Sequence, residues 1–401
     1  MQNSSSFRRG HRGRPNSPHR PRYGGQKRRN NGKQAIDPSK FINAAVEAKL
    51  ETPYESKHQF ADFGFVAGLQ ANLDTKGYKT PTAIQDGSIP ASLEGKDVIG
   101  LANTGTGKTA AFVLPIIHQL KTTEDKRTAL IIAPTRELAT QIDDEFRAFA
   151  KGLQLYSTVC VGGMNIRQQI QQLNRHPQVI IGTPGRLKDL VQQRALNLSR
   201  VGWFVLDEAD RMLDMGFLPD INFLIQQLPE KRQSLCFSAT ITPEISRLLD
   251  KMLKDPVTVS VRTTETSDHV EQNIVKVSGR DEKLAKLQEL LAQPDFDRVL
   301  VFGETKFGVQ RLADTLSRAG IPSEAIHGNK SQPQRQRALK AFKDGRVSVL
   351  VATDVAARGL DIPLVSHVIN YDQPQTYDDY IHRIGRTGRA GNRGHALTFV
   401  D

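Results

Sequence analysis

Two short segments of the 401-residue chain carry side chains suited to bind and hydrolyse a nucleoside triphosphate. The first, Ala102–Thr109, reads A-N-T-G-T-G-K-T and stands between an apolar run and an apolar helical pattern, the context of a phosphate-binding loop. Its glycines let backbone N–H groups turn toward phosphate oxygens. We expect phosphate contacts from Thr104, Gly105, Thr106, Gly107, Lys108 and Thr109, with the Thr109 hydroxyl on Mg²⁺. For this loop alone, a glycine-rich turn without a ligand remains the alternative, because Ala102 replaces the usual first glycine.

The second segment is the acidic stretch D-E-A-D that follows the apolar run Val201–Leu206. Acids at the carboxyl end of a strand stand where ligands bind in parallel sheets. Asp207 could hold Mg²⁺ directly or through water, and Glu208 could position or deprotonate the attacking water. The alternative is an ordinary acidic helix start.

A dense basic cluster lies near the end of the chain, where Tyr380–Arg389 reads Y-I-H-R-I-G-R-T-G-R. Packing His382, Arg383, Arg386 and Arg389 into so short a span is repulsive unless an anion is nearby. The alternative for this cluster is a generic basic surface.

The elements that must position these residues follow an α/β pattern. Short apolar runs such as Asp97–Leu101, Ala129–Ala133 and Val179–Gly182 alternate with amphipathic stretches, which favours parallel sheets covered by helices. The pattern stops at the polar stretch 263–268 and then resumes with Arg298–Gly303 and Val347–Thr353. We therefore predict two α/β domains, at 41–262 and 269–401, joined by a linker at 263–268.

The excess of positive charge is concentrated in the N-terminal residues. Residues 1–35 hold ten of the 55 basic residues and no acidic one, so the rest of the chain carries 45 basic against 43 acidic residues. Few aliphatic residues occur before residue 41, so we predict a disordered basic tail over 1–40 that binds nucleic acid. A solubilising tail is the alternative.

These segments together resemble the DEAD-box family of ATP-dependent RNA helicases, a branch of superfamily-two helicases, in the form of a bacterial-type minimal core with a basic N-terminal arm. Further matches are G-Y-K-T-P-T-A-I-Q at 77–85, which is similar to the family's adenine-reading motif, an aromatic residue at Phe60, and S-A-T at 238–240. Departures from the family pattern are Thr80, Asn103 and Gly303. The resemblance covers about residues 60–401 and implies two tandem RecA-like domains.

The resemblance also implies roles for residues in both domains. Gln85 would read adenine, with Phe60, Tyr78 and Thr80 near the nucleotide, and Asp361 would hold the ribose. Arg386 and Arg389 would be arginine fingers on the γ-phosphate, and His382 would couple to the acids of the first domain. Ser238 and Thr240 would link hydrolysis to strand separation.

Short matches along the chain resemble the family's RNA-binding elements, and most stand where a strand meets a helix. Hydroxyls and N–H groups at such turns suit a sugar–phosphate backbone, so we expect RNA binding with little sequence specificity. Singly, each match is also explained by helix capping or a turn. The residues are Pro134, Thr135, Arg136, Gly163, Thr183, Pro184, Arg186, Gln332, Arg335, Thr353 and Arg358.

The expected function is RNA-stimulated ATP hydrolysis, at a cleft between the two domains, that drives local unwinding of RNA duplexes or RNA–protein remodelling. ATP and Mg²⁺ are the expected ligands. A translocating DNA helicase and an RNA clamp or annealing factor with a timer ATPase are the alternatives. No apolar stretch is long enough to span a membrane. The two cysteines, Cys160 and Cys236, fit buried thiols, and we expect a cytoplasmic monomer.

Overall fold

The computed structural model describes residues 36–43, 54–103, 105–124, 126–261, 270–357, 365–388 and 393–400. Most of the predicted basic tail and the predicted linker lie outside these residues. So do four predicted site residues: Thr104, Arg358, Asp361 and Arg389.

The first α/β domain is built on a sheet of seven strands, all of them parallel. The strands are β1 (Val98–Leu101), β2 (Thr128–Ile132), β3 (Ser157–Cys160), β4 (Val179–Gly182), β5 (Val201–Asp207), β6 (Gln233–Ser238) and β7 (Val257–Ser260). Their order across the sheet is β3-β4-β2-β5-β6-β1-β7. Because that order departs from the order in sequence, residues far apart along the chain meet at one edge.

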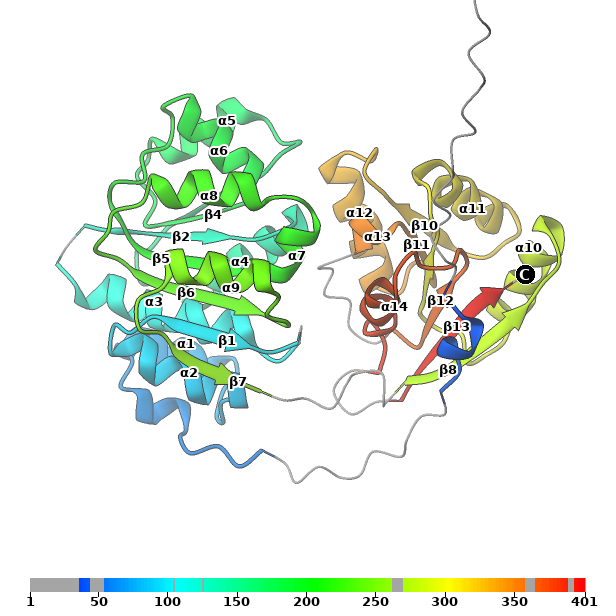
Figure 1. Cartoon of the computed structure of the whole chain (residues 1–401), viewed down its shortest axis with the longest axis horizontal. Coiled ribbons are helices and arrows are strands. Elements are labelled where there is room, and N and C mark those ends of the chain that lie inside the picture. The colour runs from blue at the N-terminus through cyan, green and yellow to red at the C-terminus, as the bar shows by residue number, and fades with distance from the viewer. Residues whose placement is uncertain are drawn as a thin grey trace, which may run out of the picture. The chain divides into compact units, whose positions relative to one another are not determined.

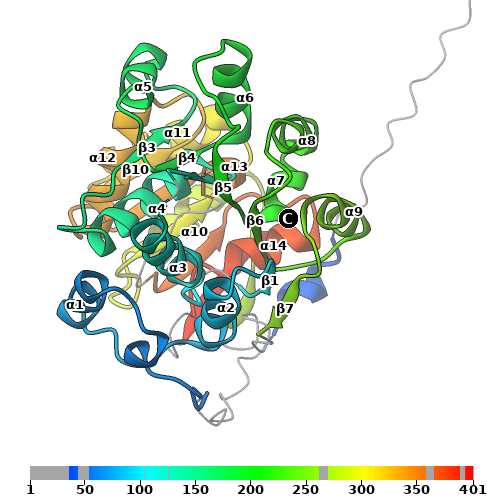
Figure 2. The same cartoon turned by 90° about the vertical axis from the view of Figure 1, so that its left-hand side faces the viewer.

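Helices cover both faces of this sheet. They are η2 (Phe60–Phe63), α1 (Ala67–Thr75), α2 (Ala83–Leu93), α3 (Lys108–Thr122), α4 (Arg136–Phe149), α5 (Ile166–Leu173), α6 (Pro184–Gln192), α7 (Ala209–Asp214), α8 (Leu218–Gln226) and α9 (Pro243–Met252). Figure 2 shows α2, α3 and α4 on one side of the strands and α8 and α9 on the other.

The core of the first domain explains this layering. Ile131 and Val205 pack in one apolar cluster with residues of α2, α3 and α4. Their neighbours Leu130 and Phe204 pack in a second cluster with residues of α6, α8 and α9. Successive side chains of a strand point to opposite faces, so strands that are apolar throughout bury both faces.

The second α/β domain repeats this plan with a sheet of six parallel strands. The strands are β8 (Val270–Lys276), β9 (Val299–Phe302), β10 (Ser323–Ile326), β11 (Val349–Ala352), β12 (His367–Asn370) and β13 (Gly394–Val400), in the order β10-β11-β9-β12-β13-β8. Its helices are α10 (Arg280–Leu291), α11 (Lys306–Arg318), α12 (Gln332–Lys343), α13 (Asp354–Ala357) and α14 (Tyr377–Ile384). The predicted pair of helix-covered parallel sheets is confirmed (Figure 1).

One segment departs from the predicted domain boundaries. The 3₁₀ turn η1 (Pro38–Phe41) precedes the first domain in the sequence, yet Phe41 is buried against residues of the second domain. Phe41–Asn43, which we had assigned to the first domain, therefore pack with the second. None of the described helices is long and apolar enough to cross a membrane.

Candidate nucleotide and nucleic-acid site

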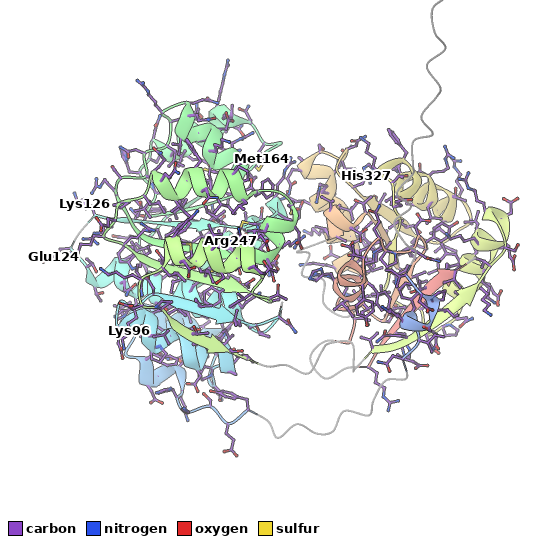
Figure 3. The ribbon with its side chains drawn as sticks, in the orientation of Figure 1. Lys96, Glu124, Lys126, Met164, Arg247 and His327 are labelled. Atoms are coloured by element: carbon purple, nitrogen blue, oxygen red, sulfur yellow. The ribbon has the colours of Figure 1, made fainter. Side chains whose placement is uncertain are left out.

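The predicted site residues that follow strands of the first domain share the carboxyl edge of its sheet, and they form two groups along it. The phosphate-binding loop, D-E-A-D and S-A-T follow β1, β5 and β6, which lie together in the sheet. The predicted RNA residues follow β2, β3 and β4, which also lie together. In Figure 3, Met164 stands at this edge, whereas Glu124 and Lys126 stand at the opposite edge. Since β2 pairs with β5, the two groups of residues are adjacent.

The phosphate-binding loop has the backbone that such a loop needs. Gly105 and Gly107 have φ angles of 90° and 89°, in the left-handed region that favours glycine. Gly107 is also the N-cap of α3, so the helix begins directly behind the loop with its partial positive charge toward it. Lys108 is buried, and its Nζ donates a 3.0 Å hydrogen bond to the carbonyl oxygen of Ala102. The ammonium group is therefore held over the loop.

The predicted adenine-reading segment is bonded to this loop. The Gln85 amide nitrogen donates to the carbonyl oxygen of Gly107 at 3.0 Å, and the Thr82 hydroxyl donates to that of Thr106 at 2.8 Å. A Cβ at Gly107 would overlap the Gln85 amide, which gives a second reason for glycine there. Gln85 therefore supports the loop, and its contact with adenine stays a prediction. Thr80 is exposed beside this segment.

The two predicted aromatic residues pack on one another. Phe60 is 1% exposed and meets Tyr78 edge-on, with ring centroids 5.5 Å apart. Tyr78 in turn meets Phe149 of α4 edge-on. The aromatic group thus fixes the segment before α2, and any nucleotide contact of these rings stays a prediction.

The two acids at the end of β5 are both buried, but their pKa values shift in opposite directions. Burial raises the pKa of Asp207 to about 7, against the opposing attraction of Lys108. Burial also acts to raise the pKa of Glu208, but Arg211, Lys108 and Arg386 outweigh it, so that pKa is lowered. Glu208 has a φ of 53°, and such strained conformations in non-glycine residues cluster at functional sites.

Arg211 is a site residue that the sequence analysis missed. Its guanidinium donates a 2.8 Å hydrogen bond to the Glu208 carboxylate, and both side chains are about nine-tenths buried. The pair is spaced i, i+3 across the start of α7, where such side chains face one another. The signal in the sequence was an arginine three residues after Glu208 and next to the apolar Met212.

Asp210 joins D-E-A-D to S-A-T. Its Oδ2 accepts hydrogen bonds from the backbone N–H groups of Ala239 and Thr240 at 2.9 and 3.0 Å. The backbone N–H of Asp210 donates to the Ser238 hydroxyl at 3.2 Å, and that hydroxyl donates to the carbonyl oxygen of Thr240. Ser238 and Thr240 are therefore bonded to the acidic motif, and Asp210 is the connection that the sequence analysis did not assign.

The predicted RNA residues of the first domain form a basic corner. Arg136 lies against the backbone at Gly163, where a Cβ would overlap its guanidinium. Arg186 donates to the carbonyl oxygen of Met164 at 3.2 Å from the neighbouring strand end. Burial, followed by the charge of Arg335, lowers the pKa of Arg136, against the opposing effect of Glu137. Closely spaced arginines of this kind suit a phosphate backbone.

The threonines and prolines of this corner begin helices. Thr135 is the N-cap of α4, and its hydroxyl accepts from the N–H of Leu138 at 3.3 Å. Thr183 is the N-cap of α6 with Pro184 at the first helical position. Both threonines are buried. Pro134 directly precedes Thr135. The N-termini of α4 and α6 therefore lie at the same edge of the sheet, and their backbone N–H groups can bind anions.

Three predicted RNA residues of the second domain also follow strands. Arg335 of α12 lies with its Nε 2.7 Å from Glu137 Oε1, and the Gln332 amide nitrogen donates to the same carboxylate oxygen at 3.2 Å. Thr353 follows β11, and its carbonyl oxygen accepts from the N–H groups of Ala356 and Ala357. Gln332 and Arg335 are thus already paired with Glu137, which directly follows the predicted RNA residue Arg136.

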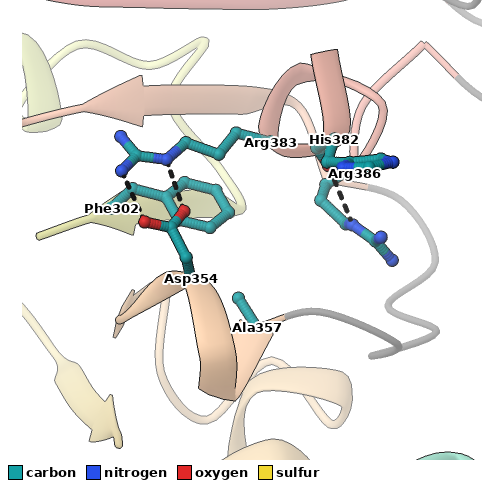
Figure 4. A pocket seen from close by; sticks show the side chains of 6 residues that line it. All are labelled: Phe302, Asp354, Ala357, His382, Arg383 and Arg386. Carbon is teal, nitrogen blue, oxygen red and sulfur yellow. Dashed lines mark hydrogen bonds and ion pairs between the residues drawn. The ribbon is translucent and has the colours of Figure 1, made fainter. Parts of the chain in front are cut away.

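The basic cluster on α14 has a partner for its buried arginine. Arg383 is 2% exposed and donates to both Asp354 carboxylate oxygens, at 2.6 and 2.8 Å (Figure 4). His382 and Arg386 line the same small hollow, and Arg386 Nε donates to the carbonyl oxygen of His382 at 3.3 Å. The sequence predicted an anion beside this cluster, and for Arg383 that anion is the carboxylate of Asp354.

Comparisons with known proteins agree with this geometry. The family model described as DEAD/DEAH box helicase matches residues 82–248, and that described as helicase conserved C-terminal domain matches residues 282–391. An ATP-dependent RNA helicase CshA of Limosilactobacillus reuteri is 47% identical over 344 residues, which cover 85% of this chain and 69% of that protein. A namesake from Listeria monocytogenes is 45% identical, over 85% of this chain and 66% of that protein.

Among solved structures, S. cerevisiae Dbp5 bound to RNA and ADP BeF3 is 31% identical with a TM-score of 0.74. The match covers 85% of this chain and 89% of that one. The chain thus spans about two thirds of the length of the curated relatives it matches, at 69% and 66%.

Proposed function

Because the chain belongs to the DEAD-box family of ATP-dependent RNA helicases, we propose that it couples RNA-stimulated ATP hydrolysis to local separation of RNA duplexes or to RNA–protein remodelling. The observation that carries this proposal is the division of one sheet edge. Phosphate-binding and acidic groups follow β1, β5 and β6, basic groups follow β2, β3 and β4, and the two sets adjoin where β2 pairs with β5. ATP and RNA bound side by side on one sheet could each bias the other's binding.

The proposal gives the main residues of the nucleotide site roles in this reaction. Lys108 would neutralise the β- and γ-phosphates, and Glu208 would orient or deprotonate the attacking water. Arg211 would hold the Glu208 carboxylate in place, since it already bonds to it. Arg386 would stabilise charge on the transferred phosphate, as would Arg389 outside the described residues. Asp361 would hold the ribose, and Gln85 would contact adenine.

The residues present fit Mg²⁺. This ion prefers hard oxygen ligands and retains several waters. Asp207 offers a buried carboxylate whose pKa is raised to about 7, so a nearby cation would favour its ionised form. The Thr109 hydroxyl provides a second oxygen at the loop. When bound, the ion would shield negative charge on the phosphate oxygens.

RNA is the proposed macromolecular partner, bound through its backbone with little sequence specificity. The Arg136 and Arg186 corner supports backbone binding, since it presents guanidinium groups and helix starts at one edge. We also propose that the protein acts as a monomer in the cytoplasm. Both cysteines are free and buried, as expected of a protein from a reducing compartment.

The test is ATP hydrolysis measured with RNA and with DNA of equal sequence, together with separation of a short RNA duplex. We expect RNA to stimulate turnover more than DNA does, and duplex separation to require ATP. Glu208→Gln should remove the stimulated turnover, whereas Glu94→Gln should not, because Glu94 is an exposed glutamate that pairs with exposed Lys96. Equal stimulation by DNA would favour a DNA motor, and RNA annealing with no ATP-dependent separation would favour the clamp.

A further inference from the structure

Residues 36–43, which we call the strap, lie on the second domain although they precede the first domain in the sequence. The strap turns through η1, where Asp37 is the N-cap, Pro38 is the first residue, and the Asp37 carboxylate accepts from the N–H of Ser39 at 3.0 Å. After the turn, Asn43 exchanges two backbone hydrogen bonds with Gln272 of β8, at 3.0 and 2.8 Å. Figure 1 shows this turn, in blue, beside β8 and β13.

The strap is fixed by one aromatic side chain. Phe41 is 0% exposed, and its ring lies 4.8 Å from that of Tyr380, tilted by 54°. It completes an apolar cluster with residues of β8, β13 and α14, namely Val270, Tyr380, Ile384, Ala396 and Val400. Lys40 adds a contact with the Tyr377 ring at 5.9 Å. Lys40 and Phe41 therefore both contact the second domain, whereas the next residue, Ile42, is 53% exposed.

The helix under the strap is the one that carries the basic cluster. Tyr380 and Ile384 are four residues apart on α14 and form the face that Phe41 covers. His382 and Arg383 lie between them in the sequence, and Arg386 follows two residues after the helix ends. The Tyr380 hydroxyl donates to the Gln272 side chain at 2.9 Å, and Gln272 is the residue whose backbone pairs with Asn43. The strap, β8 and α14 are therefore bonded into one unit.

Without the strap, two features of the second domain would lose their cover. Tyr380 and Ile384, both 0% exposed, would lose the ring that packs on them. β8 is an edge strand of its sheet, and Asn43 pairs with its outer side. Edge strands expose unpaired backbone groups that other chains can bind, so the strap blocks such pairing where Asn43 meets Gln272.

We propose that the strap is an integral part of the second domain and that Phe41 is a positioning residue for ATP hydrolysis, because it holds α14, the helix that ends two residues before Arg386. This inference rests on the proposed ATPase function for its catalytic consequence, but not for the docking itself. A protein with a loosened α14 should still bind nucleotide through the first domain, since the strap packs on β8, β13 and α14 of the second domain. The loss should therefore fall on turnover, because small displacements of a catalytic group reduce the rate of the chemical step.

The experiment compares Phe41→Ala with Ile42→Ala in the full chain. The two residues are neighbours, one buried and one exposed, so they match in position and differ in contact. Amide hydrogen exchange reports docking directly. In Phe41→Ala, residues 36–43 and the β8 residues near Gln272 should lose protection, whereas Ile42→Ala should keep it. Phe41→Leu, which retains an apolar side chain, should restore part of the protection.

RNA-saturated ATP hydrolysis reports the positioning role. We expect kcat to fall about tenfold in Phe41→Ala with a smaller change in KM for ATP, and the Leu variant to recover part of kcat. Unchanged amide protection in Phe41→Ala would overturn the docking. Lost protection with unchanged kcat would overturn the positioning role. An inactive wild-type protein would instead refute the proposed ATPase function, while the exchange experiment would still decide the docking.

Discussion

Replacing Arg383 with alanine should destabilise the second domain strongly, because this side chain connects several parts of it. Its Nε and one terminal nitrogen bond both oxygens of Asp354, which begins α13. The other terminal nitrogen donates to Asn370 Oδ1 at 3.2 Å and to the carbonyl oxygen of Asp372 at 2.6 Å. The guanidinium also lies 5.0 Å from the Phe302 ring centroid. Three strand ends, those of β9, β11 and β12, therefore meet at one side chain.

The size of the effect follows from burial. Removing one partner of a buried ion pair costs about 3–5 kcal/mol, because the other charge is left uncompensated. Here the Asp354 side chain is 26% exposed, so water can solvate it in part, whereas Asn370 is fully buried. We therefore expect a loss of about 3 kcal/mol in the free energy of unfolding of the second domain. For a domain of this size that corresponds to a fall of roughly 10 °C in its Tm.

The assay is urea and thermal unfolding of the full chain, followed by a probe in the second domain. Arg383→Lys keeps the charge but loses the two-pronged contact, so it should fall between alanine and wild type. Arg346→Ala is the matched control, since Arg346 makes an exposed pair with Asp344 and should cost less than about 1 kcal/mol. A loss below about 1 kcal/mol in Arg383→Ala would refute the reasoning, because the contacts would then contribute no more than a surface pair.

Four further predictions concern the nucleotide site and the tail. Lys108→Ala should abolish ATP hydrolysis, since the phosphates lose their main cationic partner in the first domain, and near-normal steady-state turnover would refute the loop assignment. Glu208→Gln should slow hydrolysis about a hundredfold or more while RNA still binds in the presence of ATP; failure to bind RNA would make Glu208 structural. The raised pKa of Asp207, about 7, means that its folded form holds a proton more tightly than the unfolded chain does. Its contribution to stability is then greatest at low pH and declines as pH rises from about 4 to about 7, so Asp207→Asn should gain stability relative to wild type across that window in urea unfolding. Removing residues 1–35 should flatten the dependence of log K on log salt for single-stranded RNA by roughly 2–4, or about three to six contacts, without lowering turnover at saturating RNA; an unchanged slope would exclude RNA contact by the tail.

Local patterns were enough to place most elements. The expected strand at Val179–Gly182 is β4 with the same bounds, and the expected strand at Ala129–Ala133 is β2 at Thr128–Ile132. Runs of this kind are apolar on both faces of a strand or periodic along a helix, so nearest neighbours in the sequence decide them. Boundaries moved by one or two residues, as in the expected run Val347–Thr353, where β11 spans Val349–Ala352.

The strap shows where local patterns failed. Phe41 follows the polar residues 37–40 and belongs to none of the apolar runs that predict strands, so its position in the sequence places it with the domain that follows. Its partners, Val270 and Tyr380, lie more than two hundred residues further along the chain. A single buried side chain outside a regular element leaves no periodic signal, so only the packed structure identifies it.

The sequence by itself determined the chemistry that the chain offers: a lysine in a glycine-rich loop, two acids after an apolar strand, and arginines close together near the end. These are properties of side-chain type and short spacing. The tertiary structure decided which of them meet, because strand order depends on hydrogen bonds and packing between distant segments. It placed β5 between β2 and β6, which brings the basic corner beside the acids, and it gave Asp354 and Asn43 their partners Arg383 and Gln272. Spacing along the chain carries no information on such pairings when the partners come from different strands, so this part of the site could only be read from the fold.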